Sequence, residues 1–113
     1  MSEERFWHYL DELVSTTELV IDRPKGSKHP RYASMVYPLD YGYLAGTTSG
    51  DGQGVDVWVG SLEERHVTAL LCCVDMLKRD SEIKLLLACT PAEIEQIVAL
   101  HNQGQQAAQL LLR

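Results

Sequence analysis

Two apolar segments of strand length, residues 66–77 and residues 82–89, constrain the fold of this chain most strongly. The charged sequence Lys78-Arg79-Asp80-Ser81 separates them, and a short polar interruption between two apolar runs is typical of a β-hairpin. Because both runs are almost continuously apolar, we expect this hairpin to be buried on one or both faces. The chain has 113 residues, which is room for one domain, and we expect that domain to cover residues 1–113.

Helices are predicted near both ends of the chain. Residues 3–15 form an amphipathic pattern, with apolar side chains at helical spacing: Phe6, Tyr9, Leu10, Leu13 and Val14. A second helix is predicted to begin at Pro91 and to run to about residue 103, because Thr90 and Glu93 have the spacing of a capping box. The last residues, 105–113, fit a helix or a strand equally well.

Short strands are predicted between the first helix and the hairpin, over residues 18–22 and residues 55–59. Residues 25–43 are rich in Gly, Pro, Ser and Tyr without a clear period, so we expect a long extended or looped segment there. Together these elements predict an α+β fold. We expect a small, twisted antiparallel sheet that closes toward a barrel, with one helix at the N-terminus and one near the C-terminus.

The charge of the chain excludes some partners and points to others. Its net charge of −6 argues against binding to nucleic acid or to an anionic membrane surface. Four cations, Arg23, Lys25, Lys28 and Arg31, nevertheless fall within nine residues that contain no acid, and this basic segment could meet a small anion. The chain begins without the basic and apolar pattern of a signal peptide, so we expect a cytoplasmic protein.

The cysteines and histidines do not indicate a metal or disulfide framework. Cys72, Cys73 and Cys89 all lie in apolar runs, so we expect them to be reduced core residues. Their spacing differs from that of a structural zinc site, and the histidines do not form a H-E-x-x-H motif.

A glycine-rich turn carries two carboxylates, in the sequence Asp51-Gly-Gln-Gly-Val-Asp56. Gly52 and Gly54 can adopt positive φ and so bring both carboxylates toward one hard cation, such as Mg²⁺. The same residues also fit a structure without a metal site, in which an Asp-Gly turn is followed by a strand with an exposed aspartate.

Three further segments surround this turn in the chain: Ile21-Asp22-Arg23-Pro24-Lys25-Gly26-Ser27, Tyr37-Pro38-Leu39-Asp40-Tyr41-Gly42-Tyr43, and Met76-Leu77-Lys78-Arg79-Asp80 followed by Glu82-Ile83-Lys84. In this order, over residues 18–90, the chain resembles a short and diverged member of the soluble, metal-dependent inorganic pyrophosphatases of family I. That family carries an I-E-I-P-K-G-S stretch, a Y-P-x-D-Y-G segment, a D-G-D-P-x-D metal loop and a later D-x-K.

The resemblance implies Mg²⁺-dependent hydrolysis of pyrophosphate, with Asp51, Asp56, Asp80 and Glu82 as metal ligands and Asp22 behind them. It also implies that Tyr41 acts at the catalytic centre with Asp51 and Asp56. The phosphate-binding residues it implies are Lys28, Arg31, Tyr37 and Lys84. Two bound cations would neutralise the pyrophosphate and lower the pKa of the attacking water.

Departures from the family pattern leave two alternatives open. Gln53 replaces the middle Asp of the metal loop, and an amide cannot act as the base that a carboxylate provides. A phosphate-binding hairpin is also missing, and the expected Tyr-Lys pair of the C-terminal helix is replaced by His101-Asn102. The alternatives are a non-catalytic member that binds a metal or phosphate ligand, and a hydrolase of a larger phosphoanhydride. His101 is either a phosphate donor when protonated or a residue of the apolar helix face.

We also expect a homo-oligomer. The core of a chain this small is modest, while aromatic residues gather in the first helix and Leu110-Leu111-Leu112 follows at the other end. The family resemblance implies the same without giving the number of subunits.

Overall fold

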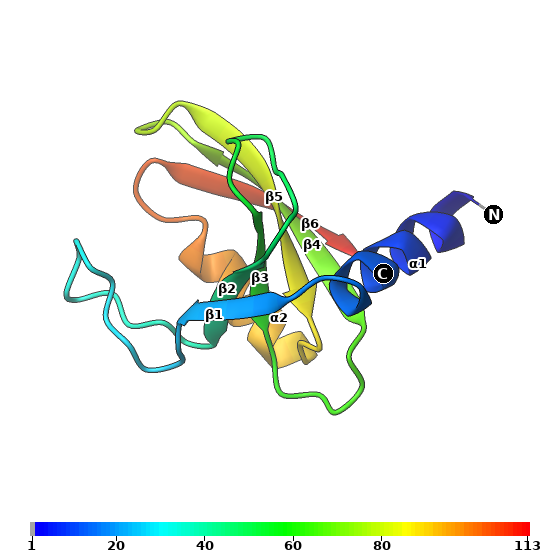
Figure 1. Ribbon diagram of the computed structural model, residues 1–113. Coiled ribbons are helices and arrows are strands. Elements are labelled where there is room, and N and C mark those ends of the chain that lie inside the picture. Colours follow the sequence, from blue (N-terminus) through cyan, green and yellow to red (C-terminus); the bar gives the residue numbers. More distant parts are fainter. Residues whose placement is uncertain (1) are drawn as a thin grey trace.

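The computed structural model describes residues 2–113 (Figure 1). Its elements, in chain order, are α1 (Ser2–Ser15), β1 (Leu19–Arg23), β2 (Asp40–Leu44), β3 (Val55–Val59), β4 (Val67–Asp75), β5 (Asp80–Leu87), α2 (Pro91–Leu100) and β6 (Gln106–Leu112). The six strands form one sheet in the order β1-β2-β3-β5-β4-β6. The predicted α+β class, both helices and the hairpin of residues 66–89, now seen as β4 and β5, are confirmed.

The sheet is mixed and open, which corrects the expectation of an antiparallel sheet that closes toward a barrel. Strand β5 returns from its hairpin between β3 and β4, and because it is antiparallel to β4 it runs parallel to β3. The other neighbouring strands are antiparallel. Strands β1 and β6 are the two edges of the sheet, so the described strands do not close on themselves.

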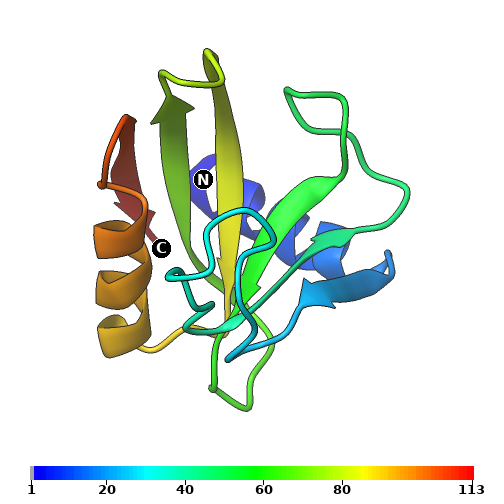
Figure 2. The ribbon, with the colours of Figure 1, turned by 90° about the vertical axis from the view of Figure 1, so that its left-hand side faces the viewer.

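The two faces of the sheet are covered by different elements, and both faces are apolar. Alternate residues such as Val57, Leu70 and Leu85 pack with Trp7 of α1 on one face. Their neighbours, such as Trp58 and Leu86, pack with α2 on the other face. Figure 2 shows α1 behind the sheet and α2 beside β6. Two-sided burial explains why β4 and β5 read as apolar runs rather than alternating patterns.

Helix α1 presents a face that is rotated from the predicted one. Trp7 is buried, whereas Phe6 and Tyr9, both assigned to the apolar stripe from spacing, are exposed. Asp11 lies on the buried side and fixes this rotation, because its carboxylate accepts the backbone N–H of Val67 at 2.8 Å and a guanidinium N–H of Arg113 at 2.9 Å. Leu10, Leu13 and Val14 of the predicted stripe do pack against the core, so only its first part was misassigned. A hydropathy pattern does not count an aspartate as a core-facing residue.

Two segments adopt strands that the sequence did not specify. Residues 40–43, expected to be part of a loop, form β2 together with Leu44, between β1 and β3. Gly42 permits this, since a Cβ at that position would lie 1.8 Å from the carbonyl oxygen of Val20. The ambiguous C-terminal segment forms β6, which pairs with β4 from Gln106 to Leu112.

Helix α2 begins as predicted, with both hydrogen bonds of the Thr90–Glu93 capping box in place. It ends at Leu100, about three residues earlier than expected, and His101 follows as its cap. In the described residues 2–113, no helix combines the length and the apolar character that crossing a membrane would need.

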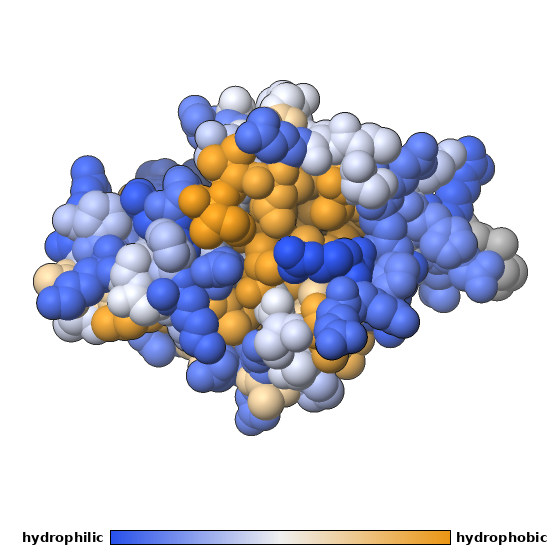
Figure 3. Space-filling model, turned by 60° about the horizontal axis from the view of Figure 1, so that its bottom comes forward, coloured by the Kyte–Doolittle hydropathy of each residue, from blue (hydrophilic) through white to orange (hydrophobic). Residues whose placement is uncertain are grey.

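The three cysteines are free, but they are not all core residues. Cys89 is buried and Cys73 is half-buried, whereas Cys72 is exposed on the face that α1 covers only in part. Figure 3 shows a face of the molecule on which hydrophobic side chains gather in the middle and remain visible between hydrophilic ends. The helices therefore leave apolar surface uncovered.

Candidate functional site

Lys84 lies at the centre of a polar cluster on the face of the sheet that carries α2. Its Nζ donates hydrogen bonds to the hydroxyl of Tyr41 at 2.7 Å, to Oδ2 of Asp56 at 3.0 Å and to Oε1 of Glu82 at 2.6 Å. The strands bring these groups together, because Asp56 is the direct partner of Lys84 in the parallel pair and Glu82 precedes Lys84 by two residues. Tyr41 reaches the same ammonium from β2, the next strand in the sheet.

The cluster is largely shielded from water. The side chain of Lys84 is 10% exposed, and those of Asp56 and Glu82 are 22% and 14% exposed. Burial alone would lower the pKa of Lys84, but Tyr41, Asp56 and Glu82 together raise it above its ordinary value. Burial also raises the pKa of the Tyr41 phenol, so both groups keep their protons at neutral pH.

Glu82 is the least satisfied member of the cluster. Its Oε1 binds Lys84, but its Oε2 is buried and has no hydrogen-bond partner. Burial raises the pKa of Glu82, and the negative charges of Asp56 and Asp51 add to this effect against the opposing charge of Lys84. A buried carboxylate oxygen without a donor is a position where a cation or a water would be stabilised.

Asp51 is exposed and is held by its own turn. Its Oδ1 accepts the hydroxyl of Ser49 at 2.8 Å and the backbone N–H of Gln53 at 2.9 Å. The bond from Gln53 and then that from Ser49 lower the pKa of Asp51, which keeps it ionised. Gly52 adopts the positive φ (82°) that the turn requires. Gly54 does not, but a Cβ at this position would lie only 3.0 Å from the carbonyl oxygen of Leu44, so a glycine fits there without a close contact.

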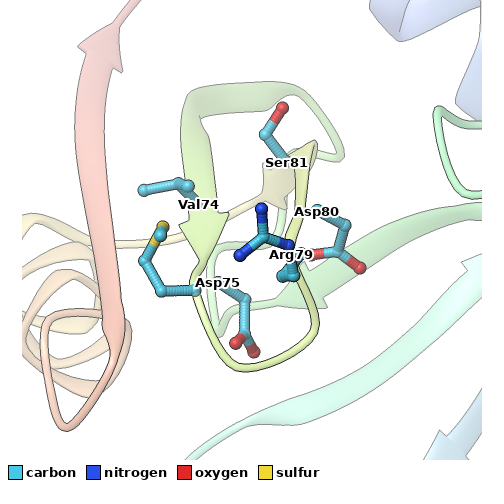
Figure 4. Close-up of a pocket in the computed structure, with 6 residues that line it drawn as sticks. Val74, Asp75, Arg79, Asp80 and Ser81 are labelled. Carbon is cyan, nitrogen blue, oxygen red and sulfur yellow. The ribbon is translucent and has the colours of Figure 1, made fainter.

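Asp80 begins β5 at the far end of the hairpin. It pairs with Asp75 and is on the same face of β5 as Glu82. A shallow pocket of about 310 Å³ lies at this turn, and Figure 4 shows Arg79 between the two strands there, with Asp75 and Asp80 on either side. The carboxylate of Asp75 serves the turn itself by accepting the N–H groups of Leu77 and Lys78.

The structure therefore brings Asp56 and Glu82 together around Lys84, with Asp51 near enough to Glu82 for each to shift the pKa of the other. Within residues 2–113, no three acidic, histidine or cysteine side chains stand together as a ready-made metal site. The positive charge at the centre of the cluster is the ammonium of Lys84. Asp22 is exposed on the edge strand β1.

A chain of aromatic rings connects this cluster to the basic segment. Tyr41 packs against Trp58 and Tyr37, and Tyr37 stacks on His29 with the ring planes 5° apart. Tyr37 is buried, while the side chains of Lys28 and Arg31 are exposed on the loop around it. Partial burial and then the charges of Arg23, Lys78 and Arg31 lower the pKa of His29. The charge of Lys78, on the β4–β5 turn, therefore acts on His29 together with those of Arg23 and Arg31, which the charge run in the sequence could not show.

His101 is part of the core rather than a phosphate ligand. Its Nε2 accepts the indole N–H of Trp58 at 3.1 Å, and burial lowers its pKa to about 4, so it is neutral at neutral pH. Asn102 is also structural, because its amide bonds the Val98 carbonyl and accepts the N–H of Ala108. Of the two readings of His101, the structure supports the apolar helix face.

The fold is that of the inorganic pyrophosphatases. Three solved structures share it, with identities that support the fold alone. The inorganic phosphatase of Anaplasma phagocytophilum has a TM-score of 0.59 at 15% identity, covering 83% of this chain and 81% of the other. The inorganic pyrophosphatase of Helicobacter pylori has a TM-score of 0.54 at 15% identity, and the match covers 85% of this chain and 75% of the other. The inorganic pyrophosphatase of Neisseria gonorrhoeae has a TM-score of 0.52 at 14% identity, and the match covers 85% of this chain and 79% of the other.

The sequence itself is similar to an inorganic pyrophosphatase of Aeropyrum pernix, with 37% identity over 79 residues. The match covers 63% of this chain and 43% of that relative, so the chain spans less than half of the relative's length. No family model matches the chain. The resemblance to inorganic pyrophosphatases that the motifs indicate is confirmed by this relative and by the shared fold.

Proposed function

We propose that this chain is a hydrolase that cleaves inorganic pyrophosphate to two phosphates with the help of Mg²⁺. The observation that carries the proposal is the cluster of Tyr41, Asp56, Glu82 and Lys84, because the hydrogen bonds of Lys84 join four residues to which the family resemblance assigns roles in the site. The similarity to the Aeropyrum pernix pyrophosphatase supports the same activity.

The residues fit a magnesium ion in part. Asp51, Asp56 and Glu82 supply carboxylate oxygens, the donors that Mg²⁺ prefers, and Oε2 of Glu82 is buried without a partner. We propose that these three, with Asp80 from the hairpin, would hold the ion. When bound, Mg²⁺ would neutralise negative charge on the substrate and lower the pKa of a water.

The side chains of the protein have separate roles in this proposal. Lys84 holds the hydroxyl of Tyr41 in place and offers its charge to a phosphate oxygen. Lys28 and Arg31 are exposed on the loop beside Tyr37 and would hold the second phosphate. Asp22 remains a proposed outer residue. The substrate is thus a small phosphate compound, and we expect a cytoplasmic protein that does not bind nucleic acid or membranes.

The test measures phosphate release from pyrophosphate with Mg²⁺ and with a chelator, comparing the wild-type chain with an Asp56→Asn variant. The proposal predicts release that needs Mg²⁺ and falls at least about 100-fold in the variant. Phosphate release that is equal in both proteins would refute it.

A non-catalytic binding protein is the second candidate, and one specific observation favours it. Lys84 already forms ion pairs with both Asp56 and Glu82, and the family resemblance places Gln53 where a carboxylate would activate water. Calorimetric titration separates the candidates: Mg²⁺ or phosphate binding without turnover supports this one. Repeating the release assay with nucleoside triphosphates tests the third candidate, a larger phosphoanhydride.

A further inference from the structure

Strand β6 is an edge strand whose outer side is only half covered. The N–H of Arg113 bonds the carbonyl of Thr68, and the carbonyl of Gln105 accepts the N–H of Met76, so the odd-numbered residues of this segment face β4. The even-numbered residues therefore direct their backbone groups away from the sheet. The outward N–H of Ala108 is occupied by the side chain of Asn102. Leu110 and Leu112 are left as the open part of the edge.

This open edge lacks the features that protect sheet edges from pairing. Residues 106–112 contain no charge and no proline, and they pair with β4 without a bulge. Leu110, Leu111 and Leu112 are 37%, 47% and 61% exposed, although leucine is usually buried. The opposite edge, β1, carries two charged residues, Asp22 and Arg23, and has a register shift between Ile21 and Arg23.

The chain exposes more surface than an average monomer of its mass. Its accessible surface is 7185 Å², whereas a monomer of 12.7 kDa is expected to expose about 6,200 Å². The excess is of the size that one partner of a standard interface buries, about 800 Å².

We propose that the β6 edge pairs with β6 of a second copy of this chain in a two-fold symmetric dimer. The strand is complementary to itself when it is antiparallel and centred on Leu111. Leu110 then faces the partner's Leu112, and Leu112 faces the partner's Leu110, with each pair exchanging backbone hydrogen bonds in both directions. Leu111 meets the partner's Leu111 on the α1 side of the sheet, and the other leucines meet on the α2 side.

A second copy fits this edge better than an unrelated strand would. An isologous interface requires one patch that matches itself, and an uncharged strand with leucines on both faces meets that requirement without like-charge repulsion. The Asn102 side chain also limits pairing to the last residues of β6, so the contact is short and centred on the leucines.

Light scattering coupled to size exclusion tests the proposal, using the full chain at micromolar concentration. The wild-type protein is expected at twice the chain mass of 12.7 kDa. In a Leu112→Lys variant, two ammonium groups are brought to the paired edge, and the dimer dissociation constant should rise at least tenfold. Leu77→Lys is the matched control, because Leu77 is 67% exposed but lies in the β4–β5 turn, and this variant should remain a dimer.

A second measurement guards against a folding defect in the variant. Leu110→Pro removes an N–H that faces away from β4, so it should abolish dimerisation while the monomer keeps its circular dichroism spectrum. Amide exchange at Leu110 and Leu112 should slow as the protein concentration rises. A monomeric wild-type chain, or a dimer that survives both substitutions, would overturn the proposal.

Discussion

Replacing Lys84 with methionine is the most informative single perturbation of this structure. The substitution keeps most of the side-chain volume but removes the charge that Asp56, Glu82 and Tyr41 share. Both carboxylates are then left in a largely buried place without a cation. Breaking a buried ion pair in this way costs about 3–5 kcal/mol of unfolding free energy, against a total of roughly 6–17 kcal/mol for a chain of this length.

Urea unfolding at pH 7, followed by tryptophan fluorescence of Trp7 and Trp58, measures the loss directly. A loss of this size should move the midpoint down by more than about 1 M urea. Lys25→Met is the control, because Lys25 is exposed and its side chain forms none of the hydrogen bonds or ion pairs found in the described residues. Its effect should stay within about 0.5 kcal/mol.

The pH dependence gives a second readout with a definite sign. The pKa of Glu82 is already raised in the folded state, and losing Lys84 should raise it further. A group with a raised folded pKa favours the folded state at low pH and loses that contribution as the pH rises through the folded pKa. The Lys84→Met variant should therefore be less destabilised at pH 5 than at pH 7.

A double variant identifies the cause. Adding Glu82→Gln to Lys84→Met removes one of the unpaired charges, so it should restore at least about 1 kcal/mol at pH 7. The reasoning fails if Lys84→Met lies within about 1 kcal/mol of the wild-type protein at pH 7, or if its deficit grows as the pH falls.

Three further predictions follow from other residues. Burial lowers the pKa of His101 to about 4, so the folded state resists protonation of this residue, and the unfolding free energy should fall by up to about 3 kcal/mol between pH 6.5 and pH 4. In urea titrations, a His101→Gln variant should lose this pH dependence. An unchanged pH dependence in the variant would contradict the buried, neutral state of His101. Gly42→Ala places a Cβ 1.8 Å from the carbonyl oxygen of Val20, so the variant should lose strand β1 or fail to fold. Circular dichroism and amide exchange would show either outcome. A melting temperature equal to that of the wild-type protein would disprove the close contact. If the chain hydrolyses pyrophosphate, Gln53→Asp should raise the rate by about 10²–10⁴-fold by restoring a base, and no gain in a folded, Mg²⁺-binding variant would mean that other missing groups limit the reaction.

The sequence alone determined the elements whose signals are local. The Thr90–Glu93 capping box with Pro91 specified where α2 begins, because those hydrogen bonds form within one turn. The charged break at residues 78–81 specified the hairpin, and the ordered motifs indicated the pyrophosphatase fold and pointed to Tyr41, Asp56, Glu82 and Lys84 as candidate site residues. These motifs carry information that periodicity does not, since they reflect a shared tertiary arrangement.

Features that depend on residues far apart in the chain became apparent in the folded protein. The effect of the Lys78 charge on the pKa of His29, and the hydrogen bond between Trp58 and His101, join positions on different elements, and no local pattern reports them. The strand of residues 40–44 and the strand β6 form because β1, β3 and β4 offer backbone partners, which outweigh weak local preference. The same pairing placed Lys84 between two carboxylates, because Asp56 and Lys84 become neighbours only when β3 and β5 lie side by side. Strand pairing is a long-range interaction, so its consequences for burial and charge appear only in the folded chain.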